Sequence, residues 1–385
     1  MDNFMTLFSF ELPTKILFGP GCVKELSAEL TQLGVSRPLL VTDKGILAAG
    51  VLDKVAAYLP KDMEYQVFHG VEPNPKDHNV SLGANAYRNF GADCILALGG
   101  GSPIDCAKSI GVLAANDASD IKGYEGKNKA SKPLPPLICI PTTSGTGSEL
   151  TFSSVITDTR NGYKMTIKNP FTAPRLAICD PKLTLSCPPE LTAACGMDAL
   201  THAIEAYTAT CAEPISDAVA LYAIELIYEN LVTCVNQGDD LEARSRLLMG
   251  SMLAGIAFSH SDVGAVHCIA EALGGEYDLP HGTCNAIFLP FMMEYNMEYC
   301  AAQYARIARA MGLSPDTGRA GALTAVRAVK QLAKDVYLPA FADLSVDPSA
   351  FDQLADVSAK NISTNSNPRP MKKEDYMQVL KLAMG

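Results

Sequence analysis

The sequence predicts an α/β half followed by an all-α half. Short apolar runs alternate with amphipathic helical patterns up to about residue 185, and long helical patterns follow. Strands that alternate with helices indicate a parallel sheet with helical crossovers. A chain of 385 residues is also too long for one core. We therefore expect two domains, residues 1–187 and residues 188–385.

The elements follow in order along the chain. In the first half, apolar runs bounded by turn residues predict strands, and amphipathic patterns between them predict helices. The predicted strands cover residues 37–43, 64–70, 92–101 and 136–143. The predicted helices between them cover residues 47–59 and 79–91. In the second half, the helical patterns cover residues 189–209, 215–235 and 241–259.

Composition narrows the classes of function. The chain has a net charge of −11 and no basic run of five residues, which argues against a nucleic-acid partner. Its twelve cysteines include no CxxC pair, so reduced thiols in a reducing compartment are expected. The N-terminus lacks the basic start of a secretion signal, and no apolar run reaches the roughly 18 residues that a membrane-spanning helix needs. These features predict a cytoplasmic protein without a membrane partner.

Two polar loops follow predicted strands. The first, GGGSPIDCAK at residues 99–108, opens a helix with three glycines and places Ser102 at a cap position. A helix N-terminus behind glycines is suited to a diphosphate, although an ordinary turn is the alternative and GxGxxG is absent. The second, PTTSGTGSE at residues 141–149, offers hydroxyls to a polar ligand, or is a solvated loop. Both loops belong to the same edge of the sheet, where ligands of open α/β sheets bind.

Asp43 ends the first predicted strand, in the sequence VTDK. A carboxylate at this place accepts hydrogen bonds from the two ribose hydroxyls of an adenosine and repels a 2′-phosphate. A helix N-cap or a turn residue is the alternative interpretation.

One carboxylate and three of the six histidines form a candidate metal set. Asp198 and His202 are four residues apart on a predicted helix, so both project from one face. His267 and His281 lie within residues 264–282, in an apolar setting where an unpaired imidazole is costly to bury. Such a set suits Fe²⁺, Zn²⁺ or Mn²⁺. A surface i,i+4 pair and satisfied core imidazoles are the alternatives, and His260 is a tentative supporting residue.

At this point the motifs match a known family. The segments FELPTKILFGPG, GGGSPIDCAK, PTTSGTGSE, GMDALTHAIEAY, DLPHG, NAIFLP and NPR occur in the family's order across nearly the whole chain. In these segments the sequence resembles the iron-containing (group III) alcohol dehydrogenases. The resemblance implies a Rossmann-like dinucleotide-binding domain over residues 1–187 and an all-α metal- and substrate-binding domain over residues 188–385.

The resemblance also implies roles for individual residues. Asp198, His202, His267 and His281 match the metal ligands, with Fe²⁺ expected and Zn²⁺, Mn²⁺ or Ni²⁺ as alternatives. Asp43 matches an acidic residue that favours NAD over NADP. The other residues expected to bind the cofactor are Asn74, Gly99, Gly100, Gly101, Ser102, Asp105, Thr142, Thr143, Ser144, Thr146, Ser148 and Lys164.

Two positions depart from the family pattern. Glu271 stands where many members have a further histidine, which has been proposed to help with proton transfer, and Ser363 stands where a cysteine is common. Glu271 and His260 are tentative replacements for that histidine. Because both changes are expected near the substrate, the identity of the substrate is not inherited from the family.

The activity implied is interconversion of alcohols with aldehydes or ketones through NAD(H). Small primary alcohols or diols are the expected substrates, and a homodimer or larger homo-oligomer is expected. The alternatives are a hydroxyacid–oxoacid transhydrogenase and another metal-dependent NAD enzyme on the same scaffold, similar to dehydroquinate synthase. The latter needs a cluster of Lys and Arg that the helical half does not show near its histidines.

Overall fold

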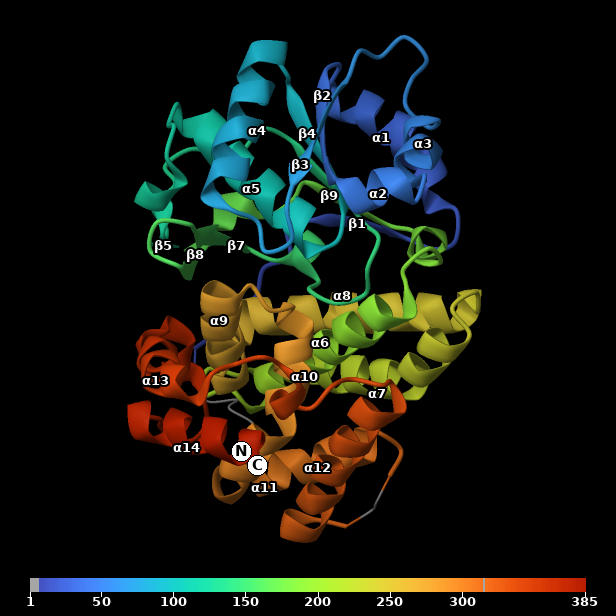
Figure 1. Ribbon diagram of the computed structural model, residues 1–385. Helices are drawn as coiled ribbons and strands as arrows, with labels where there is room; N and C mark the ends of the chain where they lie inside the picture. The colour runs from blue at the N-terminus through green and yellow to red at the C-terminus, as the bar shows by residue number, and fades with distance from the viewer. Residues whose placement is uncertain (1–6, 314–315) are drawn as a thin grey trace. The chain divides into compact units, whose positions relative to one another are not determined.

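A computed structural model describes residues 7–313 and 316–385 (Figure 1). The chain forms two compact units. One contains residues 12–143 and 148–187, and the other contains residues 188–385 with two short additions, residues 7–11 and 144–147. These two short segments differ from the predicted boundary at residue 187. The division into two independent domains therefore stays a proposal.

The first unit is built on a six-stranded parallel sheet, which confirms the predicted fold class. The order of the strands is β1-β9-β6-β4-β2-β3. Strands β2, β3, β4 and β6 match the four predicted strands, whereas the four-residue strands β1 and β9 were not predicted. The bounds are β1 Lys15–Phe18, β2 Pro38–Asp43, β3 Gln66–Val71, β4 Cys94–Gly99, β6 Leu137–Pro141 and β9 Leu176–Cys179.

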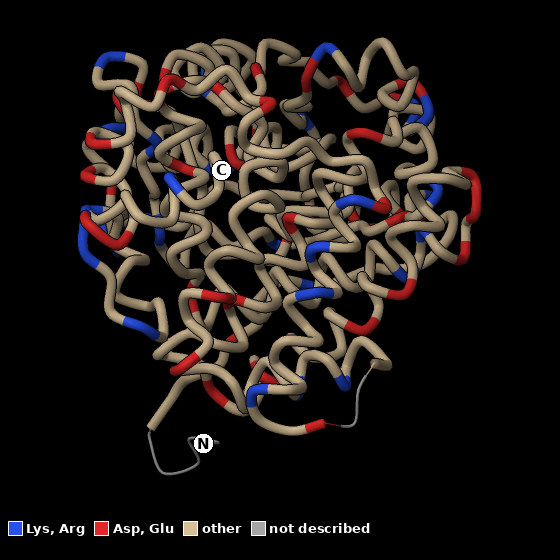
Figure 2. The backbone as a smooth tube through the Cα atoms, turned by 60° about the horizontal axis from the view of Figure 1, so that its bottom comes forward, with Lys and Arg blue, Asp and Glu red and all other residues tan. Residues whose placement is uncertain are grey.

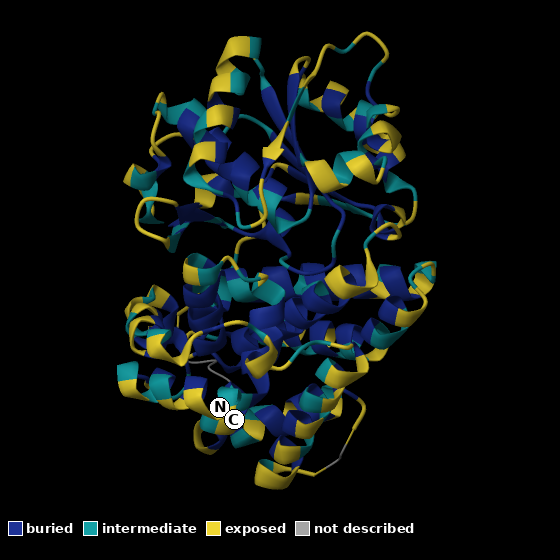
Figure 3. Ribbon diagram, in the orientation of Figure 1, coloured by how far each residue is buried: buried dark blue, intermediate teal, exposed yellow. Residues whose placement is uncertain are grey.

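Helices cover both faces of this sheet. Along β2, Leu39 and Val41 belong to one apolar cluster and Leu40 to the other, as the alternation of a strand requires. The first cluster includes residues of α4 and α5, and the second includes residues of α1 and α3. Figure 3 shows the inner strands β2, β4, β6 and β9 as a buried layer, whereas the edge strand β3 is partly exposed. The helices are α1 Leu26–Leu33, α2 Lys44–Ala48, α3 Val51–Ala56, α4 Asp77–Phe90 and α5 Gly101–Asn116, with 3₁₀ turns at Cys22–Glu25, Ile121–Tyr124, Ser148–Leu150, Pro170–Thr172 and Pro181–Thr184.

The prediction of one helix over residues 47–59 was wrong. Helices α2 and α3 are separated at Gly50, whose φ of 65° is left-handed and interrupts the helical path.

A second, three-stranded sheet was not predicted. Strands β7 (Ser153–Asp158) and β8 (Tyr163–Lys168) form an antiparallel pair, and β5 (Gly126–Lys127) adds to β8. The fully buried Lys108 of α5 holds this sheet in place, because its Nζ donates to the carbonyl oxygens of Thr151 and Ser153 at 3.0 and 2.8 Å.

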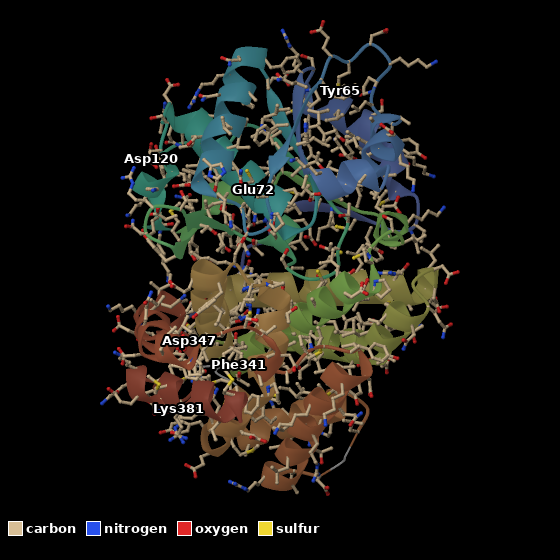
Figure 4. All side chains as sticks on the ribbon, in the orientation of Figure 1. Tyr65, Glu72, Asp120, Phe341, Asp347 and Lys381 are labelled. Atoms are coloured by element: carbon tan, nitrogen blue, oxygen red, sulfur yellow. The ribbon has the colours of Figure 1, made fainter. Side chains whose placement is uncertain are left out.

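The second unit is helical, as predicted. Helix α6 packs against α7, α8 and α10, and every residue from Thr201 to Thr208 is buried (Figure 3). Phe341 lies within this unit (Figure 4), edge-on to Phe288 with ring centroids 4.8 Å apart. The helices are α6 Pro189–Thr208, α7 Pro214–Asn236, α8 Leu241–Ser261, α9 Ala265–Tyr277, α10 His281–Tyr295, α11 Met297–Ala310, α12 Gly318–Asp335, α13 Phe351–Lys360 and α14 Lys373–Met384, with 3₁₀ turns at Phe341–Asp343, Pro348–Ala350 and Ile362–Ser366.

Helix α7 is long and apolar enough to cross a membrane, judged by its length and composition. The sequence patterns did not predict a segment of this kind. Core helices of soluble proteins pass the same test, and α7 contributes Ala220, Ile224, Ile227 and Leu231 to the helical core. This helix is therefore weak evidence for a membrane span. Charged residues of both signs are interspersed along the chain (Figure 2).

Candidate functional site

Helix α6 presents three polar side chains along one face. Asp198, His202 and Glu205 follow one another at intervals of four and three residues, which place them on successive turns of the same face. All three are buried, with exposed fractions of 3, 5 and 6%. Burial of a carboxylate requires compensation by hydrogen bonds or by a positive charge. The face therefore indicates a site rather than a solvated helix surface.

Two further helices bring imidazoles to this face. His267 lies in the first turn of α9, and His281 is the first residue of α10. Gly282 allows α10 to begin close to α6, because a Cβ at this position would collide with the carbonyl oxygen of Ala194. The Pro-His-Gly sequence is thus explained by close packing that places His281 beside Asp198.

The predicted metal ligands converge. Nitrogen or oxygen atoms of Asp198, His267 and His281 all lie within 4.8 Å of one another. Oδ1 of Asp198 is 4.0 Å from Nε2 of His267 and 3.8 Å from Nε2 of His281. The ring of His202 lies next to them, with its centroid 4.4 Å from that of His267. Spacings of this size bring the three atoms within reach of one cation.

Glu205 orients the ring of His267. Its Oε2 lies 2.5 Å from Nδ1 of His267, and its Oε1 accepts from the backbone N–H of Val266 at 2.8 Å. Burial alone would lower the pKa of His267, but the charge and the hydrogen bond of Glu205 outweigh burial and raise that pKa. A carboxylate on Nδ1 leaves Nε2 to face the other ligands, an arrangement common around metal-binding histidines.

His202 has the opposite environment. Burial, followed by the charge of His267, lowers the pKa of His202 well below its usual value, so its ring is neutral at pH 7. Its Nδ1 is buried without a hydrogen-bond partner, 3.9 Å from Oδ2 of Asp198. The backbone of Gly145 hydrogen-bonds to this ring, and the ring of Phe258 stacks on it at 4.3 Å.

These residues fit a divalent cation. The set combines one carboxylate with imidazoles, which are ligands suited to Fe²⁺ or Zn²⁺. A buried ring nitrogen without a partner, as in His202, is costly unless something compensates for it. A cation bound beside Asp198 would supply that compensation.

The two tentative catalytic residues have different surroundings. Both ring nitrogens of His260 are engaged, since Nδ1 is 2.8 Å from the carbonyl oxygen of Ile256 and Nε2 lies 3.0 to 3.2 Å from the backbone of Glu11. His260 therefore fixes the N-terminal segment to α8. Glu271 lies one helical turn after His267, half-buried, and accepts from Nδ2 of Asn361 at 2.6 Å. Glu271 remains near the candidate site, whereas His260 has a structural task.

Ser363, which departs from the family pattern, takes part in a loop contact. Asp262 accepts from the hydroxyls of Ser363 and Ser366 at 3.1 and 3.0 Å. This carboxylate thus holds the turn at Ile362–Ser366.

In the α/β unit, the predicted nucleotide residues gather at one end of the sheet. Strand β2 ends at Asp43 and the adjacent β4 ends at Gly99. Because β3 lies on one side of β2 and β4 on the other, the chain reverses direction across the sheet between β2 and β4. Open α/β sheets bind nucleotides outside the strand ends at such a point.

The glycines after β4 are required by the backbone. Gly99 has a φ of 149°, and a Cβ at Gly99 would lie 2.6 Å from the ring of Pro103. Gly100 is the N-cap of α5 and lies against the side chain of Thr143. Ser102 is therefore inside the first turn, and the prediction that Ser102 occupies the cap was wrong. Gly100 takes the extended conformation that an N-cap needs.

Asp105 and Ser148 bind one another. Ser148 Oγ donates to Oδ1 of Asp105 at 2.5 Å, and the backbone N–H of Val155 donates to Oδ2 at 3.0 Å. Burial raises the pKa of Asp105 despite the nearby charge of Lys108. These contacts join α5 to β7, so both residues shape the loop, and their direct contact with a cofactor stays a prediction.

The remaining predicted cofactor residues fall into three groups. Nζ of Lys164 donates to Oδ1 of Asn74 at 2.8 Å, so the structure brings these two together. The backbone N–H of Thr142 donates to the carbonyl oxygen of Gly99 at 3.0 Å, which joins the two loops. Ser144 and Thr146 belong to the short segment that packs with the helical unit. Asp43 caps α2 by accepting from the N–H of Ile46 at 2.9 Å, which matches the alternative interpretation of this residue.

Comparison with models of protein families identifies the family of this chain. The profile described as "Iron-containing alcohol dehydrogenase" matches residues 13–181, and "Fe-containing alcohol dehydrogenase family, C-terminal" matches residues 192–384. The chain belongs to the iron-containing alcohol dehydrogenase family. Membership confirms the resemblance seen in the motifs and makes the protein an oxidoreductase.

Relatives of the family match over nearly the full length of the chain. A 1,3-propanediol dehydrogenase of Citrobacter freundii is 39% identical, and the match covers 98% of this chain and 99% of the relative. An NAD-dependent methanol dehydrogenase of Bacillus methanolicus is 36% identical over 98% of this chain and 100% of the relative. The crystal structure of a 1,3-propanediol oxidoreductase superposes with a TM-score of 0.95 at 39% identity, over 98% and 100% of the two chains.

Two residues of the site were missed by the analysis of the sequence. Glu205 follows Asp198 by seven residues, and Asn285 follows His281 by four. Both spacings continue a helix face that already carried predicted ligands, so the signal was present.

The contact between Glu205 and His267 yields a prediction. Replacement Glu205→Gln removes the charge that orients the ring, and we expect Zn²⁺ to bind about 10- to 100-fold more weakly. Competition with a fluorescent chelator measures this affinity. Glu213→Gln is the matched control, because Glu213 is equally buried in the same unit but caps α7. Equal affinities of wild type and Glu205→Gln would contradict this role.

Proposed function

We propose that the protein is a metal-dependent, NAD(H)-linked dehydrogenase that interconverts small primary alcohols or diols with their aldehydes. The observation that carries the proposal is the convergence of Asp198, His267 and His281, with His202 beside them. Family membership and the names of the relatives, a 1,3-propanediol dehydrogenase and an NAD-dependent methanol dehydrogenase, support it. A cytoplasmic location and a homo-oligomeric state stay predictions.

The α/β unit supports the choice of NAD. Asp43 ends β2 at the point where the sheet changes direction, and its negative charge disfavours a ligand with a 2′-phosphate. Gly99 and Gly100 allow a diphosphate to approach the N-terminus of α5, whose free N–H groups and partial positive charge favour an anion. We assign Thr142, Thr143 and Lys164 to the same ligand.

In the helical unit, Asp198, His202, His267 and His281 would hold the cation. A divalent cation held there supplies Lewis-acid polarisation of the alcohol or carbonyl oxygen, and NAD⁺ accepts the hydride in alcohol oxidation. Glu205 keeps Nε2 of His267 directed at the set. Phe258, stacked on His202, shields that ring on one side with an apolar surface.

Oxidation of an alcohol also releases the hydroxyl proton. We assign its acceptance to Glu271, which is half-buried one turn from His267 and is fixed by Asn361. A carboxylate held at this distance from a metal ligand is placed to exchange a proton with the substrate directly or through water. His260 is not included, because its ring nitrogens bind Ile256 and Glu11.

The proposal predicts that Asp43 sets the choice of cofactor. Asp43→Ser retains an oxygen that caps α2 but removes the charge. We expect the ratio of kcat/KM with NADP⁺ to that with NAD⁺ to rise roughly tenfold or more. Steady-state assays with both cofactors measure the ratio. Asp53→Ser, an exposed change in α3, is the control, and an unaltered ratio in Asp43→Ser would refute the assignment.

The proposal also predicts that His267 is needed for turnover but not for cofactor binding. In His267→Ala we expect NADH formation to fall roughly 100-fold or more, since the set loses one ligand. Protein reloaded anaerobically with Fe²⁺ or Zn²⁺ would be assayed by NADH absorbance with short alcohols and diols, and calorimetry would follow NAD⁺ binding.

His78→Ala is the control for this experiment, because His78 is half-exposed and pairs with Glu72 at 2.7 Å. Glu72 is labelled in the α/β unit in Figure 4. Unchanged turnover in His267→Ala would remove the metal role from the proposal.

A further inference from the structure

Asn285 lies at the centre of the predicted ligand set. It follows His281 by one turn of α10, and its side chain is completely buried. Its Nδ2 is 2.7 Å from Oδ1 of Asp198, 3.1 Å from Nε2 of His267 and 3.2 Å from Nε2 of His281. One amide nitrogen therefore contacts the same three atoms that converge as candidate metal ligands.

The direction of these hydrogen bonds is fixed by chemistry. An amide NH₂ group only donates and has two hydrogens, so Nδ2 bonds to at most two of these three atoms at one time, and a ring that accepts from it must turn a lone pair toward Asn285. At His267 the other ring nitrogen is consistent with this direction. Its Nδ1 faces the carboxylate of Glu205, which only accepts, so Nδ1 carries a hydrogen. The reversed amide would place its oxygen 2.7 Å from the carboxylate oxygen Oδ1 of Asp198, and neither oxygen has a hydrogen to donate. Oδ1 of Asn285 has no hydrogen-bond partner, so nothing on that side favours the reversal.

We propose that Asn285 is a positioning residue for the metal, an inference that rests on the proposed metal site. Its NH₂ group lies between Asp198, His267 and His281 and bonds to two of them at a time, which keeps the three atoms that face it close together. The tautomer that it selects, with the lone pair on Nε2, is the one with which each ring binds a cation. Asn285 therefore prepares three ligands before the cation arrives.

Part of this arrangement persists when a cation is bound. A carboxylate oxygen has more than one lone pair, so Oδ1 of Asp198 can bind a cation and still accept from Asn285. Each Nε2 has a single lone pair, so the contacts of Asn285 to the two rings are given up. The lasting hydrogen bond to Asp198 distinguishes a positioning residue from one that only fills space between the ligands.

The test compares variants of the full-length protein by their affinity for Zn²⁺. Asn285→Leu keeps nearly the same volume and removes the donor, and Asn285→Ser keeps one donor in a smaller side chain. Asn296→Leu is the matched control, because Asn296 is also a buried amide of this unit but bonds to Asn367. Chelator competition gives the affinity, and the absorption spectrum of Co²⁺-loaded protein reports the coordination geometry.

We expect Asn285→Leu to bind Zn²⁺ about 10- to 100-fold more weakly than wild type, and Asn285→Ser to lie between the two. We also expect the Co²⁺ spectrum to change in Asn285→Leu and to remain as in wild type in Asn296→Leu. Equal or tighter Zn²⁺ binding by Asn285→Leu would overturn the inference, since the amide would then only occupy the space of the cation. If Asn285→Leu does not fold, Asn285→Ser decides the question alone, and wild-type affinity in that variant would likewise overturn it.

This outcome is separable from failure of the proposed function. If wild-type protein binds Zn²⁺ and His267→Ala does not, the metal site stands whatever Asn285 does. If His267→Ala binds Zn²⁺ as well as wild type, the metal site itself fails, and the inference about Asn285 fails with it.

Discussion

The helical unit depends on the burial of a polar stripe inside an apolar core. Asp198, His202 and Glu205 lie on a helix whose other buried residues are mostly apolar or small. Two carboxylates in such a place cost several kcal/mol each unless positive charge and hydrogen bonds compensate for them. The packing of α9 and α10 against this stripe supplies imidazoles and an amide, and in the proposed function a divalent cation would complete the balance of charge. The proposed function and the stability of the fold thus both require these buried polar side chains to be compensated.

The α/β unit meets a different constraint. A parallel sheet with both faces covered leaves only its ends for a polar ligand. We therefore propose that the residues at the ends of β2, β4 and β6 recognise the cofactor. Gly99 and Gly100 are selected by backbone geometry there, whereas Asp105, Lys108 and Ser148 tie the loop to its supports. These three polar side chains thus bond to one another and support the loop from inside the unit.

The sequence predicted the elements that are buried on both sides or strongly periodic. Strands β2, β4 and β6 are apolar along almost their whole length, and α6 to α8 carry long helical patterns. Strands β1 and β9 were missed because four residues hold too little pattern, and β7 and β8 because polar residues interrupt them. The break at Gly50 depends on a left-handed backbone that composition alone does not reveal.

The sequence likewise predicted only part of the arrangement of the candidate site. Spacing identified Asp198 with His202, and rarity drew attention to His267 and His281. Glu205 and Asn285 were not predicted as site residues. Their role depends on which side chains of other helices face them, and this is tertiary information. The same reason explains His260, whose task is set by an N-terminal segment that is about 250 residues away in sequence yet packs against its ring.

X-ray absorption spectroscopy of the metal-loaded protein tests the central claim most directly. With Zn²⁺ bound, the account predicts a first shell of nitrogen and oxygen atoms at roughly 2.0–2.2 Å, with the multiple-scattering signature of imidazole rings. A first shell that contains sulfur at about 2.3 Å, or one without imidazole, would show that the cation binds elsewhere. Either result would contradict the convergence of Asp198 with the three histidines as the metal site.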